Sequence, residues 1–268
     1  MKITKGIIPA AGLGTRMRPV TGGRPKELWP LGGKPMIQWA VEMHALSGIT
    51  DIAIIISPSK EEIVHFLTYL KSHPPELLWD QVELTFFYQE QPRGVADAVS
   101  LVRDHIGAEP FALTMPDLVS FGAEPFLAQL MPHFFNYDTD VIGMTILTGA
   151  RATGFGNVGR LQVEPLSPPV YRVTHLSDKQ PGVITIDGSG PIFKGFGGGI
   201  YHPGYLDLIE KFRNVTPGEL DDVPIHQHLI KTVGLNGVMV NGEVFDVGNV
   251  NGYQSAVNYL ESKAQSQI

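Results

Sequence analysis

Short apolar runs alternate with amphipathic stretches along the first 147 residues of this chain. Continuous apolar runs that end in loop residues are typical of strands buried on both faces of a parallel sheet. Apolar residues at helical spacing, as from Pro35 to Leu46, predict the helices between them. The predicted strands are 4–11, 52–56, 82–88, 111–115 and 141–147, and the predicted helices are 35–46, 59–71, 95–106 and 124–135. This alternation predicts an α/β fold, a Rossmann-like, open, twisted, mixed but mostly parallel sheet with helices on both faces.

The pattern changes after about residue 150, where Pro and Gly separate shorter strand-like runs. We expect strands at 158–163, 170–176, 197–201 and near 238–245, and helices at 203–213, 224–233 and 251–263. No long polar linker divides the chain, and it contains no internal repeats. We therefore predict one domain over residues 1–268, built from two halves of about 1–150 and 151–268.

Composition narrows the class of protein. Hydrophobic residues make up 43% of the 268 positions, which is enough for a packed core, and the absence of cysteine excludes disulfides, thiol nucleophiles and cysteine zinc sites. Because no signal pattern or apolar run of membrane-spanning length is visible, we expect a cytoplasmic protein without a membrane partner. The net charge of −7 argues against nucleic-acid binding, so an anionic ligand needs a locally positive site.

Such a site is predicted directly after the first strand. The apolar run Gly6–Ala11 leads into a glycine loop, and the window 16–34 then carries five basic residues against the single acid Glu27. Glycine lets the backbone approach a ligand closely, so that main-chain N–H groups can hold phosphate. Several cations beside that loop favour a polyphosphate over a single anion.

Two common phosphate-binding patterns do not fit this loop. The dinucleotide motif Gly-x-Gly-x-x-Gly is matched by Gly12 and Gly14, but Met17 stands at its third glycine, which argues against a Rossmann-type oxidoreductase. The P-loop motif needs Ser or Thr after Gly-Lys, whereas Lys34 is followed by Pro35.

The segments Gly-Leu-Gly-Thr-Arg at 12–16, Pro-Lys-Glu-Leu at 25–28 and Lys-Pro-Met-Ile at 34–37 resemble the sugar-nucleotide pyrophosphorylases, also called sugar-phosphate nucleotidyltransferases. The residues of these segments are most similar to those of bacterial UTP–glucose-1-phosphate uridylyltransferases, and the resemblance extends over roughly residues 3–260. It implies a nucleotide-binding first half and a sugar-phosphate-binding second half. The resemblance implies that the partners of this protein are a nucleoside triphosphate and a sugar-1-phosphate, and that its cofactor is Mg²⁺.

The resemblance also implies roles for particular residues. Arg16, Lys26, Asp117 and Asp246 would be catalytic, with both aspartates holding Mg²⁺, an ion that prefers oxygen ligands. The residues implied in nucleotide binding are Ala11, Gly12, Gly14, Thr15, Arg16, Lys26, Gln91 and Gly94. Those implied in sugar-phosphate binding are Phe155, Gly156, Asp178 and Lys179. The last pair lies in Asp-Lys-Gln-Pro, which departs from the Glu-Lys-Pro of the family by an Asp and an inserted Gln180.

The expected reaction is attack by the sugar-1-phosphate on the α-phosphorus of the triphosphate, with UTP and glucose-1-phosphate favoured. The alternatives are a glucose-1-phosphate thymidylyltransferase, a cytidylyltransferase of another phosphorylated small molecule, and a catalytically silent nucleotide-sugar sensor. His226 and His228 are not expected to bind zinc, because residues two apart lie on different sides of a helix and no third ligand is evident. The sequence leaves open the base, the sugar and whether the chain forms a homo-oligomer.

Overall fold

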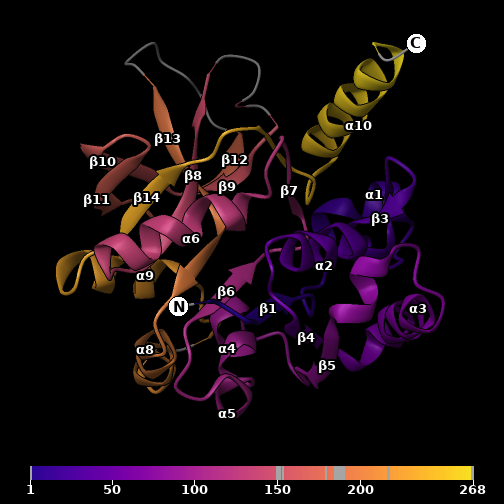
Figure 1. The fold of residues 1–268 in the computed structure, drawn as a ribbon, viewed down its shortest axis with the longest axis horizontal. Helices are drawn as coiled ribbons and strands as arrows, with labels where there is room; N and C mark the ends of the chain where they lie inside the picture. The colour runs from indigo at the N-terminus through magenta and orange to yellow at the C-terminus, as the bar shows by residue number, and fades with distance from the viewer. Residues whose placement is uncertain are drawn as a thin grey trace.

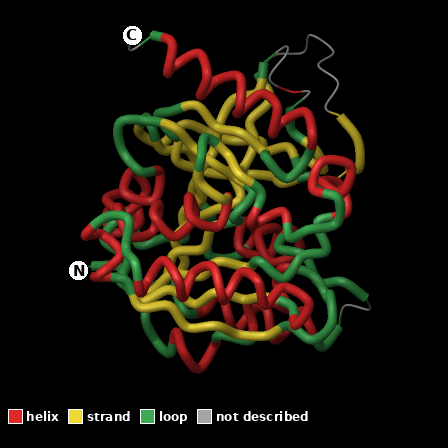
Figure 2. The backbone as a smooth tube through the Cα atoms, turned by 90° about the vertical axis from the view of Figure 1, so that its right-hand side faces the viewer, coloured by secondary structure: helices red, strands yellow, loops and turns green. Residues whose placement is uncertain are grey.

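A nine-stranded sheet carries helices on both faces (Figures 1 and 2). The computed structural model describes residues 2–148, 152, 154–178, 180–183, 191–215 and 218–266. The strands of its main sheet are β1 (Lys5–Pro9), β4 (Asp51–Ile56), β5 (Glu83–Tyr88), β6 (Phe111–Thr114), β8 (Val141–Leu147), β10 (Arg160–Ser167), β11 (Val170–Leu176), β13 (Ile192–Tyr201) and β14 (Asn236–Met239). Their order across the sheet is β10-β11-β14-β8-β13-β6-β1-β4-β5.

The N-terminal part of this sheet is the parallel α/β arrangement that the sequence predicts. β5, β4, β1 and β6 are parallel neighbours, with Lys5 of β1 in register with both Asp51 and Phe111. The helices of the first half are α1 (Arg18–Thr21), α2 (Met36–Leu46), α3 (Glu61–Ser72), α4 (Val95–Ser100), α5 (Arg103–Ile106) and α6 (Phe126–Tyr137). The single helix predicted at 95–106 is therefore two short helices.

Strand β4 explains why both faces of the sheet must be covered. Its alternate residues Ile52, Ile54 and Ile56 join the hydrophobic cluster that includes α2, α3 and α6. Ala53 and Ile55 point to the opposite face, into the cluster that includes α4, α8 (Gly204–Arg213) and α9 (Val223–Lys231). All five side chains are fully buried, which is why this segment reads as a continuous apolar run.

The expectation of an open, mostly parallel sheet is wrong for the second half. β13 runs antiparallel to β6 and β8, and β10 runs antiparallel to both β11 and β13. The pairing of β10 with β13 closes the strands β10, β11, β14, β8 and β13 into a small barrel-like sheet. Only two residues, Pro168 and Pro169, connect β10 to β11, and so short a connection can join only antiparallel strands.

A two-stranded ribbon outside the main sheet places the last part of the chain. β7 (Leu118–Phe121) pairs antiparallel with β15 (Glu243–Asp246), so that Asp246 lies opposite Leu118. The strand predicted near 238–245 is therefore two strands, β14 and β15, which belong to different sheets. β15 leads into α10 (Val250–Gln265), which extends to the edge of the molecule (Figure 1). The remaining short strands are β2 (Pro30–Leu31), β3 (Lys34–Pro35), β9 (Gly156–Val158) and β12 (Gln180–Val183).

Within the described residues, no helix combines the length and the apolar character needed to cross a membrane.

Candidate active site

Two adjoining clefts open at the carboxyl ends of β1 and β6. The first is lined by the glycine loop from Ala11 to Arg16 and by Lys26, Gln89 and Gly248. The second runs over the C-terminal half and is lined by Gly156, Lys194 and Asp246, among others. Gly12, Arg16, Gly94 and Asp117 line both clefts, so the two spaces meet at these residues. Such a position, beyond the carboxyl ends of parallel strands, is where open α/β sheets bind ligands.

The glycine loop connects β1 to the 3₁₀ helix η1 (Thr15–Met17). Gly14 has φ of 61°, in the left-handed region, which the other residue types rarely adopt. A side chain at this position would also approach Lys26, whose Cγ lies 3.4 Å from the place of a Cβ. The loop therefore packs against the Lys26 side chain.

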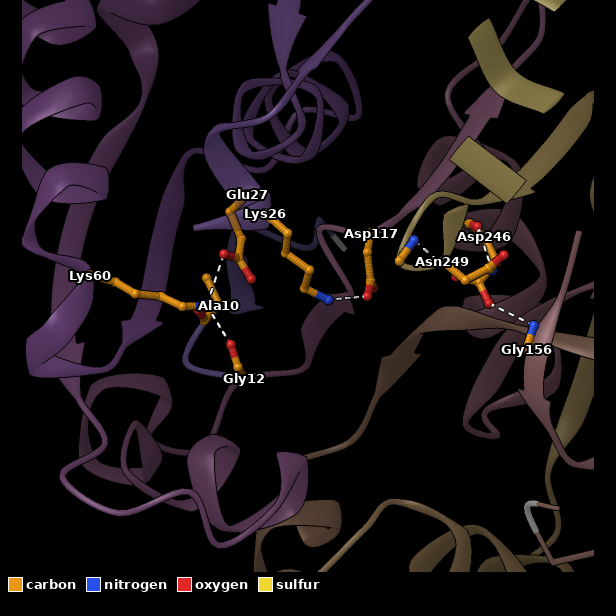
Figure 3. A network of polar contacts seen from close by, with 10 residues as sticks. Ala10, Gly12, Lys26, Glu27, Lys60, Asp117, Gly156, Asp246 and Asn249 are labelled. Atoms are coloured by element: carbon orange, nitrogen blue, oxygen red, sulfur yellow. Dashed lines mark hydrogen bonds and ion pairs between the residues drawn. The ribbon is translucent and has the colours of Figure 1, made fainter. Parts of the chain in front are cut away.

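Lys26 comes from a second 3₁₀ helix, η2 (Lys26–Leu28), and forms an ion pair with Asp117, just beyond β6 (Figure 3). Both side chains are largely buried, with exposed fractions of 13% and 16%. Burial acts to lower the pKa of Lys26, but the charges of Asp117 and Glu27 outweigh it and hold that pKa above its usual value. Burial likewise acts to raise the pKa of Asp117, and the charges of Lys26 and Arg16 bring it below its usual value. Both groups are therefore charged at neutral pH.

The ribbon of β7 and β15 brings Asp246 beside Asp117. The backbone N–H of Val247 donates to the carbonyl of Asp117 at 2.8 Å, which joins the two segments directly. Asp246 accepts a hydrogen bond from the N–H group of Gly156 at 3.1 Å (Figure 3). It accepts a second from the N–H group of Gly248 at 3.0 Å. Burial and the neighbouring charge of Asp117 raise the pKa of Asp246. The sequence predicted both aspartates but missed β7, whose pairing brings them together.

Asn249 fixes the path of the chain after Asp246. Its side-chain oxygen caps α10 by accepting from the N–H of Gly252 at 2.9 Å. Its side-chain amide donates to the carbonyls of Gly154 and Asp246, each at 3.0 Å. One side chain thus connects the start of α10 to the loop before β9, which supplies the Gly156 amide.

Arg16 extends toward the second half of the site. Its Nη1 lies 3.0 Å from the place that a Cβ would occupy on Gly156, so glycine there leaves room for the guanidinium. The charge of Arg16 also helps to lower the pKa of Asp117, and it opposes the rise in the pKa of Asp246. The four predicted catalytic residues, Arg16, Lys26, Asp117 and Asp246, therefore lie together where the two clefts join.

The two aspartates have the chemistry of a partial magnesium site. A Cβ on Gly248 would lie less than 3.0 Å from an Asp117 carboxylate oxygen and 3.1 Å from Asp246 Oδ1, so both carboxylates face the same small space. Within the described residues, no group of three or more His, Asp or Glu side chains could hold an ion. Two carboxylates suit Mg²⁺, which commonly takes its remaining ligands from water and substrate phosphates.

Of the two residues predicted to recognise the base, Gly94 lies at the clefts and Gln91 does not. Gly94 lines both clefts, but its φ of 97° and its close contact with the Leu220 backbone already require glycine there. Gln91 is exposed, does not line either cleft, and accepts a hydrogen bond from Arg93 at 2.8 Å. Gln89, two residues earlier, is buried at the first cleft and donates to the carbonyl of Gly94 and to Asp97. Sequence reasoning selected Gln91 from its Gln-Pro motif and missed Gln89.

The predicted sugar-phosphate residues do not all lie at the second cleft either. Gly156 lines the second cleft, whereas Phe155 is buried in a hydrophobic cluster. Asp178 is exposed and accepts a hydrogen bond from Gln227 at 3.0 Å, and Lys179 lies outside the described residues. A cation that the sequence did not single out, Lys194 of β13, lines this cleft and acts to lower the pKa of Asp246. In the sequence, Lys194 is visible only as a single lysine within a run of Phe and Gly residues.

Comparisons with known proteins identify the family of this chain. A family model described as nucleotidyl transferase matches residues 5–263. A UTP–glucose-1-phosphate uridylyltransferase of Staphylococcus saprophyticus is 30% identical over 267 residues, covering 94% of this chain and 91% of that protein. Another from Bacillus subtilis is 32% identical over 194 residues, covering 67% of this chain and 65% of that one. A crystal structure of UDP-glucose pyrophosphorylase with UDP-glucose shares the fold, with a TM-score of 0.82, 23% identity, and coverage of 97% of this chain and 99% of that chain.

This chain belongs to the nucleotidyl transferase family.

Proposed function

We propose that this enzyme transfers the uridylyl group of UTP to glucose-1-phosphate, giving UDP-glucose and pyrophosphate, and that it requires Mg²⁺. The observation that carries the proposal is the convergence of Arg16, Lys26, Asp117 and Asp246 at the junction of the two clefts. One cleft adjoins the glycine loop, as a triphosphate requires, and the other leaves space for a second substrate. UTP and glucose-1-phosphate are the substrates for which the relatives are named.

The chemistry needs no general base. The second pKa of a phosphate monoester is about 6, so the sugar phosphate is mostly a dianion at neutral pH. One of its oxygens forms a bond to the α-phosphorus of UTP, and the bond from that phosphorus to the bridging oxygen of the β-phosphate breaks. Pyrophosphate leaves with the bonding electron pair. The main barriers are the repulsion between two polyanions and the charge that develops on the leaving group.

The described residues can lower both barriers. The glycine-loop amides and Arg16 would hold the β- and γ-phosphates, and Lys26 would hold the α-phosphate. Lys194, with Lys179 as the resemblance implies, would direct the sugar phosphate from the second cleft. Mg²⁺ bound by Asp117 and Asp246 would supply further positive charge to the phosphate oxygens. Preorganised charges of this kind are commonly the largest single contribution to catalysis.

We propose that the loop after β5 recognises the base. A glutamine amide can donate and accept hydrogen bonds at once, which matches the adjacent carbonyl and N–H groups of uracil or thymine. Gln91 stays our proposed reader through its motif. Gln89 lies closer to the cleft but already contacts Gly94 and Asp97.

A substrate panel tests the proposal. The purified protein is mixed with Mg²⁺, with UTP, dTTP, CTP, ATP or GTP, and with several sugar-1-phosphates, and pyrophosphate release is measured. We expect the highest kcat/KM for UTP with glucose-1-phosphate. Higher efficiency with dTTP or CTP would replace the proposed substrate, and no release from any pair would refute the enzymatic proposal.

A further inference from the structure

A buried lysine outside the predicted motifs contacts the back of the glycine loop. Lys60 ends the 3₁₀ helix η3 (Pro58–Lys60), which follows β4. Its Nζ donates to the carbonyl oxygens of Ala10 at 2.8 Å and Gly12 at 2.5 Å, and to Glu27 Oε2 at 2.8 Å (Figure 3). The side chain of Lys60 is 8% exposed and that of Glu27 is 1% exposed. An ammonium has three N–H donors, so these three acceptors satisfy it fully.

The two backbone contacts orient the loop. In a trans peptide the C=O and N–H groups point in opposite directions. Because Lys60 draws the carbonyls of Ala10 and Gly12 toward itself, the N–H groups of Ala11 and Leu13 are directed away from it. Ala11, Gly12 and Leu13 all line the first cleft. Lys60 thus binds the carbonyl side of the loop and leaves the opposite side, with its N–H groups, available to a ligand.

The third contact reaches the segment that carries Lys26. Glu27 is adjacent to Lys26 in η2, and the two side chains diverge to different partners, Glu27 to Lys60 and Lys26 to Asp117 (Figure 3). Without Lys60, Glu27 would be a buried carboxylate lacking this cation, a situation that destabilises folded proteins strongly. A single buried ammonium therefore fixes the positions of both the loop and Lys26.

We propose that Lys60 is a positioning residue that orients the glycine-loop amides and Lys26 toward the triphosphate of the nucleotide without contacting it. This inference rests on the proposed function, because it takes the glycine loop to be the triphosphate site. It predicts a loss that is specific to the nucleotide and leaves the sugar phosphate unaffected. A purely structural role would instead reduce the amount of folded enzyme and leave both KM values unchanged.

The test compares Lys60→Met with the control Lys5→Met. Lys5 also joins β1 to β4, at the opposite end of the same strand pair, through an ion pair with Asp51 at 2.5 Å. For Lys60→Met we expect the Kd for UTP with Mg²⁺ and the KM for UTP to rise at least tenfold. The KM for glucose-1-phosphate should stay within twofold of wild type. Lys5→Met should leave all three values within twofold, and UTP binding unchanged in Lys60→Met would overturn the proposal.

A double variant separates positioning from stability. Combining Lys60→Met with Glu27→Gln removes both members of the buried ion pair, so no unpaired charge remains inside the protein. We expect its melting temperature to recover relative to Lys60→Met while the Kd for UTP stays raised at least tenfold. Recovery of UTP affinity together with stability would show a structural role only and would refute the proposal.

The binding measurement does not depend on turnover. If wild-type protein bound UTP but released no pyrophosphate with any sugar phosphate, the proposed reaction would be wrong, yet the Lys60 comparison could still be made by calorimetry. If the wild type turned over normally and Lys60→Met bound UTP normally, only the positioning role would be wrong.

Discussion

Replacing Gly248 by alanine would place a methyl group between the two aspartates without changing any charge. The added Cβ would lie less than 3.0 Å from Asp117 Oδ2, 3.0 Å from Asp117 Cγ and 3.1 Å from Asp246 Oδ1. The φ of Gly248 is outside the range that favours glycine, so the backbone itself tolerates alanine. The substitution therefore acts through displacement of the carboxylates.

The size of this displacement sets the expected effect. Asp117 would have to move by roughly 1 Å to reach ordinary van der Waals separation, and a misplacement of about 1 Å in a catalytic site can reduce the rate about 100-fold. Such a loss corresponds to about 2.7 kcal/mol of transition-state stabilisation. Because Lys26 is paired with Asp117, the movement would also disturb Lys26. We expect kcat for Gly248→Ala to fall by about two orders of magnitude.

The assay is pyrophosphate release at saturating UTP, glucose-1-phosphate and Mg²⁺, with thermal unfolding measured on the same samples. The matched control is Gly204→Ala at the start of α8, where a Cβ would meet nothing within 4 Å. The control should turn over like the wild type and melt at the same or a slightly higher temperature. Wild-type turnover by Gly248→Ala would show that the two carboxylates do not face the reacting groups.

Four further substitutions test the site and two other parts of the structure. Lys26→Ala and Asp246→Ala should each reduce kcat about 10²- to 10³-fold without unfolding the protein, and near-normal turnover in either would contradict its role. Gly94→Ala should lower the free energy of unfolding in urea by about 1–3 kcal/mol, because its φ of 97° and its contact with Leu220 disfavour a side chain. Hydrogen bonding to Asp140 raises the pKa of His202, with Asp138 acting in the same direction, so this stabilisation is complete below the unfolded pKa and disappears as pH rises through the folded one. His202→Ala should therefore cost more stability at pH 6 than at pH 9, and an equal cost at both would contradict this reasoning.

The parts of the site that the sequence predicted are those set by local motifs. Gly12, Gly14 and Arg16 follow a buried strand within a few residues, so the end of β1 places them at the cleft whatever the rest of the chain does. Asp117 is located in the same way by β6. The predicted catalytic residues converge where the two clefts meet.

The features that the sequence missed depend on non-local contacts. The pairing of β7 with β15 joins segments more than 120 residues apart, and β10 closes on β13 across the intervening β11 and β12. Neither pairing leaves a periodic signal in one segment. Lys60 and Lys194 are single cations without a surrounding motif, and their contacts appear only once the chain has folded. In loops, as at Gln91 and Asp178, side-chain direction follows the backbone path rather than residue type.

The charges that line the clefts explain why Mg²⁺ should matter for binding. Arg16, Lys26 and Lys194 bring three positive charges, but six carboxylates line the clefts as well: Glu27, Asp117, Glu219, Asp221, Asp222 and Asp246. Screening limits the influence of distant charges to about 8 Å at physiological salt, so these local charges matter more to a bound phosphate than the net charge of the chain. A divalent ion at Asp117 and Asp246 would remove the repulsion of these two carboxylates toward phosphate. We therefore expect UTP to bind at least tenfold more weakly in EDTA than in Mg²⁺, and Asp246→Asn to reduce that difference. Equal affinity under both conditions would show that the carboxylates lie too far from the bound phosphates to repel them.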